Sequence, residues 1–230
     1  MRKIKFVFVL FSLLMLAGCN YFTEPEGQYM VTTLGFEETR GGFTVYLQAV
    51  DLKKGEQNGN PDTFTVKGEG KTPQKALTDA KTTLGKTLSI KHCELIVLSD
   101  TVSREGIEKI FSLCDALEIP FKTRLCVCAD IEKLLSYDGV SAGFELSSLI
   151  RQNANNSGFG GHTALYEIKT AVQVSDGDFA LPVLKTEGEV KVAGLLVFEG
   201  GEGAEYLDFD QSINYAKKHG LNNRKGGFSS

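Results

Sequence analysis

Leu95-Ile96-Val97-Leu98 is the stretch that decides the fold. A continuous apolar run of this length is typical of a strand that is buried on both faces of a sheet. Upstream, Thr72 and Pro73 indicate the start of a helix, because Thr caps helix N-termini and Pro suits the first helical position. Downstream, we expect a second helix to start near Asp100 and to end before Pro120, which bars its continuation.

Both predicted helices carry apolar residues at helical spacing. These stripes consist of Leu77, Ala80, Leu84 and Leu88 in the first helix, and of Ile107, Ile110, Phe111, Cys114 and Leu117 in the second. Alternation of apolar and polar residues predicts strands at 63–69 and 123–129. The resulting order of strand, helix, strand, helix, strand predicts a βαβαβ unit with right-handed crossovers and partly parallel pairing.

Two further strand-like segments precede this unit, at residues 29–37 and 43–51. The turn chemistry of Thr39-Arg40-Gly41-Gly42 between them indicates an antiparallel hairpin. The expected fold class is therefore α/β of the mixed α+β kind, with a mixed parallel and antiparallel sheet and covering helices.

The last third of the chain predicts a smaller, strand-rich part. Asp130 and Ser141 are expected to cap helices, and the Asn- and Gly-rich loop at 153–161 is a candidate boundary. Beyond it we expect a helix at 164–174, strands at 179–184, 190–198 and 205–208, and a closing helix at 210–219. The predicted division is a signal peptide at 1–18, a tether at 19–27, an N-terminal α/β domain at 28–157, a second small part at 158–220 that docks on the first, and a disordered tail at 221–230.

Leu16-Ala17-Gly18-Cys19 ends a short apolar run and has the form of a lipobox. Arg2, Lys3 and Lys5 form a basic start, and the apolar run at 6–16 is too short to span a bilayer, which takes about 20 residues. Such a cysteine receives a diacylglycerol on its sulfur before the leader is removed. We therefore expect acylated Cys19 to hold the protein to membrane lipid.

Composition argues for a globular domain that does not bind nucleic acid. Removal of the leader takes away three basic residues, so 25 Lys and Arg become 22 against 29 acidic residues, a net charge of −7. This mildly acidic balance, without a basic cluster, does not suggest a nucleic acid partner. A hydrophobic content of 42% is enough to fill a core.

Four cysteines remain in the predicted mature chain beside Cys19, namely Cys93, Cys114, Cys126 and Cys128. We favour buried free thiols, although export permits a disulfide from Cys93 or Cys114 to the strand that carries the other two. Their spacing matches no zinc pattern. The sequence also offers no catalytic triad, carboxylate pair or cofactor fingerprint, so we expect neither an enzyme nor a bound cofactor or metal.

Several short motifs follow one another along the chain in an order that matches a known family. They comprise Val31-x-x-Leu34-Gly35-Phe36, Gly70-Lys71-Thr72-x-x-x-Ala76-Leu77, Lys91-His92, Glu105-Gly106-Ile107, Leu181-Pro182, Val192-Ala193-Gly194-Leu195-Leu196-Val197-Phe198 and Tyr206-Leu207-Asp208. With the lipobox before them, these motifs resemble the Ger(x)C family, the lipoprotein C subunits of bacterial spore germinant receptors. Asn20 stands where that family usually has Trp, and Cys114-Asp115 stands where it commonly has Arg-Asp. Because members usually continue into a further C-terminal domain and this chain stops at Ser230, we expect a truncated or divergent member.

The resemblance implies a non-enzymatic subunit that acts with the membrane-embedded A and B subunits in receptor assembly and germination signalling. It implies a lipid-anchored position on the outer face of the cell or spore inner membrane. The alternative is a free-standing solute-binding or envelope-surface lipoprotein. Among the family-motif residues, Gly70, Thr72 and Lys91 are expected to be structural, and His92 is expected to make a hydrogen bond whose loss costs about 1–3 kcal/mol.

Overall fold

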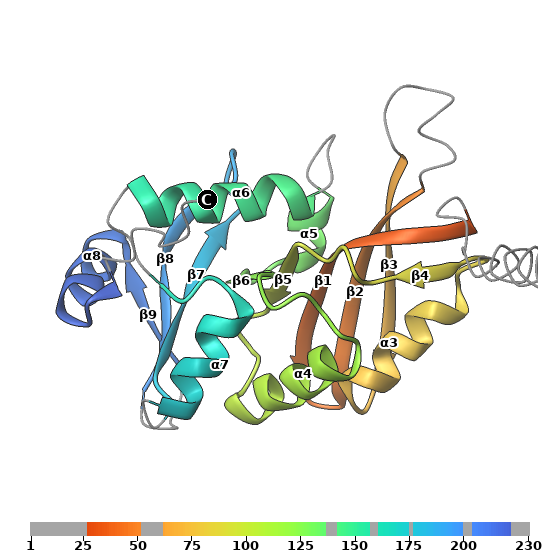
Figure 1. The fold of residues 1–230 in the computed structure, drawn as a ribbon, viewed down its shortest axis with the longest axis horizontal. Helices are drawn as coiled ribbons and strands as arrows, with labels where there is room; N and C mark the ends of the chain where they lie inside the picture. Colours follow the sequence, from red (N-terminus) through yellow and green to blue (C-terminus); the bar gives the residue numbers. More distant parts are fainter. Residues whose placement is uncertain are drawn as a thin grey trace, which may run out of the picture.

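A single mixed β-sheet runs through the molecule, with helices on both of its faces (Figure 1). The structure is a computed structural model, and it describes residues 27–51, 62–136, 142–156, 161–174, 177–199 and 204–221. Nine strands form the sheet in the order β3-β2-β1-β5-β6-β7-β8-β9, with β4 paired to β1 beside this path. The strands are β1 (Gln28–Thr39), β2 (Gly42–Asp51), β3 (Asp62–Gly70), β4 (Thr87–Ser89), β5 (Leu95–Leu98), β6 (Arg124–Val127), β7 (Phe179–Lys185), β8 (Lys191–Phe198) and β9 (Ala204–Asp208).

The first three strands form an antiparallel meander, which confirms the predicted hairpin. β1 and β2 pair from Thr39↔Gly42 at the turn to Tyr29↔Asp51, and β3 continues the sheet beside β2. The β1–β2 register shifts between Val31 and Thr33, where the extra residue makes a bulge.

The centre of the sheet is parallel, which confirms the predicted partly parallel pairing, but the strand beside β5 is β1 and not β3, the first strand of the predicted βαβαβ unit. β1 pairs with β5 at Thr33↔Leu95, β5 pairs with β6 at Leu95↔Arg124, and β6 pairs with β7 at Val127↔Val183. Parallel strands start at the same end of a sheet, so the amino ends of β1, β5 and β6 point the same way. We call this end the amino end of the sheet.

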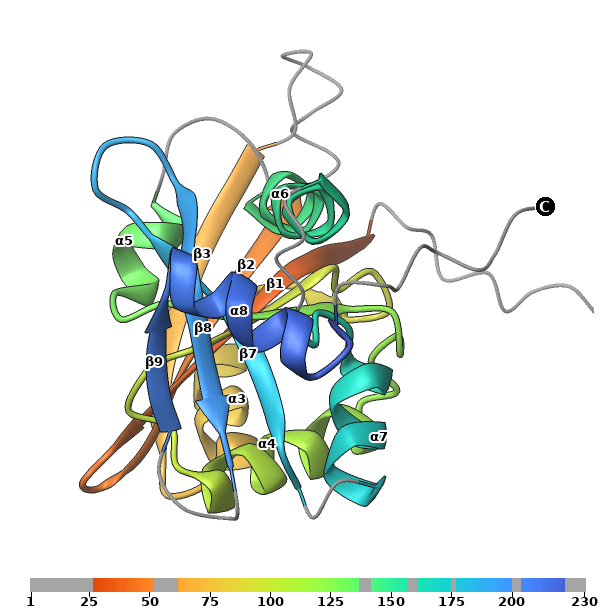
Figure 2. The ribbon, with the colours of Figure 1, turned by 90° about the vertical axis from the view of Figure 1, so that its left-hand side faces the viewer.

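The late strands add to the same sheet. β8 pairs antiparallel with β7, and β9 pairs antiparallel with β8 (Figure 2). Pairing with β7 accompanies the burial of Leu195 and Val197, and the strand expected at 190–198 is confirmed. The sheet is thus continuous from β3 to β9, while the division of the chain into two parts near residue 157 stays a prediction.

Helices cover the sheet in two layers. The helices are α3 (Pro73–Thr82), α4 (Arg104–Ala116), α5 (Ile131–Leu135), α6 (Ala142–Asn156), α7 (Leu165–Val174) and α8 (Phe209–Lys218). α3, α4 and α7 lie on one face, α5 and α6 lie on the other, and α8 packs at the β8–β9 end (Figures 1 and 2). The mixed α+β class that the sequence predicts is therefore confirmed.

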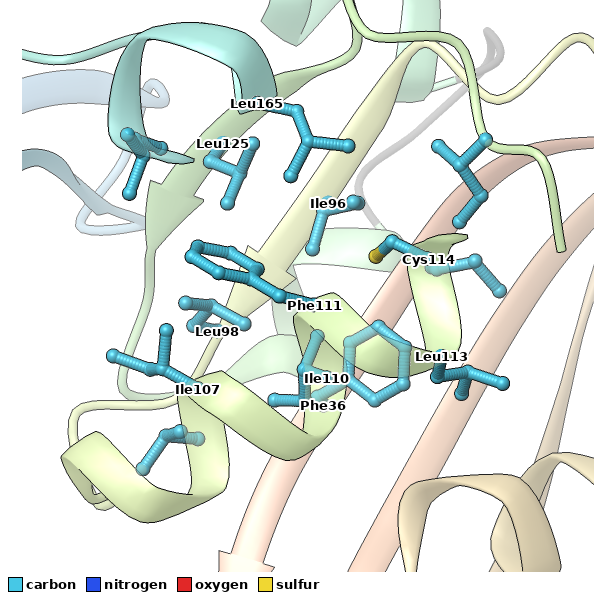
Figure 3. Close-up of a cluster of buried hydrophobic side chains, with 14 of the residues drawn as sticks. Phe36, Ile96, Leu98, Ile107, Ile110, Phe111, Leu113, Cys114, Leu125 and Leu165 are labelled. Carbon is cyan, nitrogen blue, oxygen red and sulfur yellow. The ribbon is translucent and has the colours of Figure 1, made fainter. Parts of the chain in front are cut away.

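Each layer encloses its own apolar core. Ile96 and Leu98 of β5 point into the core under α3, α4 and α7, and Figure 3 shows them facing Phe111 of α4. Leu95 and Val97 point into the opposite core, under α5 and α6. This two-sided burial is the property that a continuous apolar run indicates.

Three helix boundaries differ from the prediction. α3 ends at Thr82 and does not extend to Leu88, because the hydroxyls of Thr82 and Thr83 donate to carbonyls of the last turn and the chain then forms β4. α4 starts at Arg104, four residues after Asp100, since Ser103 caps the helix by accepting from the Gly106 amide at 3.0 Å.

At the third boundary, α6 continues to Asn156, so residues 153–156 belong to a helix and not to the predicted loop. The Asn153 side chain donates to the Leu149 carbonyl at 3.1 Å, a bond that is compatible with continued helical backbone. Asn is a poor helix former, but its cost of a few tenths of a kcal/mol is easily overridden by packing. Other expected ends agree: Thr72 caps α3 and Asp130 caps α5.

All four described cysteines are buried free thiols, as predicted. Cys93 and Cys114 lie in the core beneath α4, where Figure 3 shows the Cys114 sulfur among apolar side chains. Cys126 and Cys128 lie in the core on the other face. The sheet thus separates the two pairs, and the alternative of a disulfide between them is wrong.

Candidate functional site

Three chain segments meet at the amino end of the parallel strands. The turn before β5 presents Lys91 and His92, the turn before β6 presents Phe121 and Lys122, and the first turn of α7 presents Tyr166. All five side chains are exposed. We call these five residues the amino-end surface.

Hydrogen bonds join the three segments into one surface. The Thr123 hydroxyl donates to the Cys93 carbonyl at 2.7 Å, which ties the second segment to the first. The Leu165 amide donates to the Thr123 carbonyl at 2.9 Å, and the Tyr166 amide donates to the Phe121 carbonyl at 3.1 Å. Because Thr123 and Cys93 are themselves buried, the positions of the exposed residues are fixed from beneath.

The turn before β6 forms because α4 is followed by a residue in the left-handed conformation. Glu118, just after α4, has a φ of 53°, and the Ile119 amide reaches back to the Cys114 carbonyl at 3.0 Å. This pattern closes a helix and turns the chain away from its axis. Pro120 follows, and its carbonyl accepts from the Thr123 amide at 2.9 Å. Phe121 and Lys122 are therefore the tip of a tight turn and point away from the core.

The two aromatic residues of the surface are the most exposed large hydrophobic side chains in the described part of the chain. Phe121 is 62% exposed and Tyr166 is 49% exposed. Their rings make an edge-to-face contact with centroids 6.2 Å apart, and Lys122 Nζ lies 5.8 Å from the Phe121 centroid. An exposed aromatic pair beside a cation provides both apolar contact area and positive charge to a partner.

The carboxylate of Glu167, next to Tyr166 in the sequence, makes hydrogen bonds within the fold. The Glu167 carboxylate accepts from the backbone amides of Thr163 at 2.9 Å and Ala164 at 3.0 Å, which caps the start of α7. Arg124 Nη1 donates to the Thr163 hydroxyl at 2.6 Å and holds the same turn. These bonds fix the first turn of α7, and with it the direction of the Tyr166 side chain.

The start of β1 lies beside this surface. β4 pairs in parallel with the first residues of β1 up to Met30↔Ser89, and Lys91 follows β4 by two residues. Close by, Lys86 Nζ forms a salt bridge with buried Asp51 at 2.9 Å and lies 4.8 Å from the Tyr29 ring centroid. The chain thus enters the domain at the amino end of the sheet.

The predicted site residues fall into three places. Lys91 and His92 join the amino-end surface. Gly70 and Thr72 lie at the opposite end, where β3 leads into α3, and the Thr72 hydroxyl accepts from the Lys75 amide at 3.2 Å. Leu16, Ala17, Gly18 and Cys19 lie outside the described residues.

The hydrogen bond expected of His92 stays a prediction, but the side chain does not have the burial that the expected loss of stability assumed. Its side chain is exposed on the turn before β5 and is not buried against the strand. The residue that performs the expected task is Thr123, whose hydroxyl bonds the carbonyl next to His92. Exposed substitutions usually change stability by less than about 0.5 kcal/mol, so the loss expected for a buried hydrogen bond does not apply to His92.

Phe121 and Tyr166 were not predicted as site residues from the sequence. A usable signal existed for Phe121, which falls outside both the apolar stripe of α4 and the alternation of β6. An apolar side chain that serves neither periodicity has no core position to occupy. Tyr166 carried no such signal, because it lies one residue from Leu165, which does point into the core.

Two shallow hollows lie at the other end of the sheet. One, of about 380 Å³, lies between the β1–β2 turn and the β3–α3 junction and includes Gly42 and Gly70. The other, of about 320 Å³, lies between α3 and α4 and includes Pro73 and Leu113. No described side chains of His, Cys, Asp or Glu gather in a group of three or more that could hold a metal ion. Within the described ranges, no helix is both long enough and apolar enough to cross a membrane.

A comparison with protein families identifies the chain. The family model for the spore germination protein N-terminal domain matches residues 23–186. This range runs from upstream of β1 to the end of β7 and covers the whole amino-end surface. The chain belongs to this family, and its role lies in spore germination. Searches of curated proteins and of solved structures found no match.

Proposed function

We propose that the protein is the lipid-anchored, non-enzymatic C-type subunit of a spore germinant receptor, and that it acts in receptor assembly and germination signalling. The observation that carries the proposal is the position of the family match. It begins at residue 23, four residues after Cys19 of the lipobox. The family's domain thus directly follows a lipidation signal.

Acylation of Cys19 explains how such a domain stays at a membrane. Two acyl chains hold a protein stably at a bilayer surface, where one chain gives only marginal binding. Gly27 is the eighth residue after Cys19, and an extended chain of that length spans at most about 29 Å. The domain is thereby kept near the outer face of the spore inner membrane.

The proposed partners are the A and B membrane subunits of the receptor, which the resemblance to C subunits implies. The fold suits an assembly role better than a catalytic one. The four cysteine thiols that the structure describes are buried, and the two most exposed large hydrophobic residues of the described ranges, Phe121 and Tyr166, lie together on the surface. Exposed aromatic residues are enriched where proteins meet partners.

Co-purification from spore membranes tests this proposal. An affinity tag at the C-terminus of the chain should recover A-type and B-type receptor subunits in comparable amounts after mild detergent extraction. The matched control is another tagged lipoprotein from the same membrane, which should recover neither. Recovery of the tagged chain alone, or with the subunits of a transporter, would show that it is not a receptor subunit.

A further inference from the structure

We propose that the amino-end surface rests on the membrane itself, with Phe121 and Tyr166 in the interfacial layer and Lys91 and Lys122 against anionic lipid headgroups. This inference deepens the proposed function and rests on its lipid anchor. It assigns a binding surface and a ligand class, the anionic phospholipid headgroup. The site combines two aromatic rings and two lysine side chains, and it lies at the end of the sheet where β1 begins.

The position of the surface supports a lipid ligand. Lys91 lies two residues beyond β4, which pairs with the first residues of β1. β1 begins at Gln28, nine residues after Cys19. A tether of this length reaches at most about 30 Å, so the end of the molecule that carries Gln28 stays within that distance of the bilayer. The most exposed aromatic residues thus lie at the end that the anchor holds down.

The chemistry of the surface also matches an interface between water and lipid. Aromatic side chains favour the headgroup level, and lysines extend toward phosphate with their alkyl stems against apolar atoms. Phe121 is more than half exposed and is held at a turn tip by a fixed hydrogen-bond frame. Exposure of a large apolar ring to water is unfavourable. Transfer of the Phe121 ring into the membrane interface would therefore lower the free energy.

Charge complementarity favours an anionic surface. The predicted mature chain has a net charge of −7 and would be repelled by anionic lipid as a whole. At the amino-end surface, Lys91 and Lys122 are exposed, while the carboxylate of Glu167 is bound by backbone amides. The acidic residues nearest in sequence are Glu94, which is half-buried two residues after His92, and Glu118, which is exposed three residues before Phe121. Each lysine near an anionic surface contributes about fivefold in binding.

A single tryptophan reports on the contact, because the chain contains none. The acylated Phe121→Trp protein is reconstituted on vesicles of phosphatidylcholine alone and on vesicles that also contain phosphatidylglycerol. We expect blue-shifted emission, and quenching by brominated acyl chains, on the anionic vesicles. A Phe209→Trp protein is the control, since Phe209 is an exposed aromatic residue of α8, which packs on β8 and β9 at the edge of the sheet. Its emission should not change.

Charge variants test the headgroup contact. In the Phe121→Trp protein, the double change Lys91→Gln and Lys122→Gln should lower the equilibrium constant for docking on the anionic vesicles. We expect a decrease of about fivefold for each lysine removed. Lys71→Gln with Lys75→Gln makes the same change in net charge at exposed positions on the opposite end and should leave the signal unchanged. An equal loss in both pairs would overturn the proposal, because it would show that only net charge matters.

The result also separates docking from anchoring. Flotation of the protein with the vesicles, without any change at Phe121→Trp, would overturn docking and leave the anchor intact. Failure to float would remove the anchor on which the inference rests. A change at Phe121→Trp that occurs only when A and B subunits are present would assign the surface to a protein partner and overturn the lipid assignment.

Discussion

Replacement of Gly68 by alanine should destabilise the fold by about 3 kcal/mol, near the upper end of the usual cost of overpacking. A Cβ atom at Gly68 would lie 2.2 Å from the Ala80 amide nitrogen and 2.4 Å from the Ala76 carbonyl oxygen. Both are backbone atoms of α3, so no side chain can rotate away. The helix must therefore move off β3 and open the core around Leu77, which is fully buried.

Gly85→Ala is the matched control. A Cβ at Gly85 would have no other atom within 4 Å, and its backbone does not require a positive φ. Removing a glycine there restricts the unfolded chain and should leave stability unchanged or raise it by up to about 1 kcal/mol. Urea unfolding midpoints of the two variants provide the comparison. Equal midpoints would contradict the close packing of α3 against β3.

The second large effect is a loss of stability at alkaline pH. Burial raises the pKa of Cys114 to about 12 from its ordinary value of 9.0. The pKa values of Cys93 and Cys126 are raised above the same ordinary value, again mainly because burial disfavours the thiolate. The native state thus keeps these three thiols protonated where the unfolded chain would ionise them.

The sign follows from proton linkage. Each of these thiols has a higher pKa in the native state than in the unfolded chain. Its contribution to the free energy of unfolding is therefore fully present below about pH 8 and is lost as the pH rises beyond 9. At pH 10 each thiol lowers the free energy of unfolding by on the order of 1 kcal/mol, so the three thiols together lower it by several kcal/mol. Comparison of urea unfolding at pH 8 and pH 10 measures this difference.

A cysteine variant identifies the source of the effect. Cys114→Ala should lower stability at pH 8 because it leaves a cavity, yet between pH 8 and pH 10 it should lose less stability than the parent, by on the order of 1 kcal/mol. The thiols should also resist alkylating reagents at pH 8 until the chain unfolds. A parent protein that is equally stable at both pH values would contradict the burial of these cysteines.

The fold could be predicted to the extent that burial is periodic in the sequence. The run at β5 revealed two-sided burial, and Thr72 with Pro73 revealed the start of α3. The end of α3 could not be predicted in this way, because Leu84 and Leu88 continue its stripe. Leu88 lies in β4, where it pairs with Tyr29. A pairing with a strand almost sixty residues earlier leaves no mark in a local window.

The candidate site was less predictable than the fold. Lys91 and His92 were identified through a family resemblance, which gave their importance but not their exposure. Phe121 and Tyr166 become neighbours only because the turn before β6 bonds the start of α7. Such a surface arises from three segments that the topology brings together, so each segment looks unremarkable alone.

The most direct test of the lipid-anchored germination subunit is the chemical state of Cys19 in spores. Mass spectrometry of the N-terminal peptide should find Cys19 as the first residue with a diacylglyceryl group on its sulfur. The Cys19→Ala protein should leave the membrane fraction, because no described helix can span a bilayer in its place. An unmodified Cys19, together with membrane partition that survives Cys19→Ala, would contradict the account.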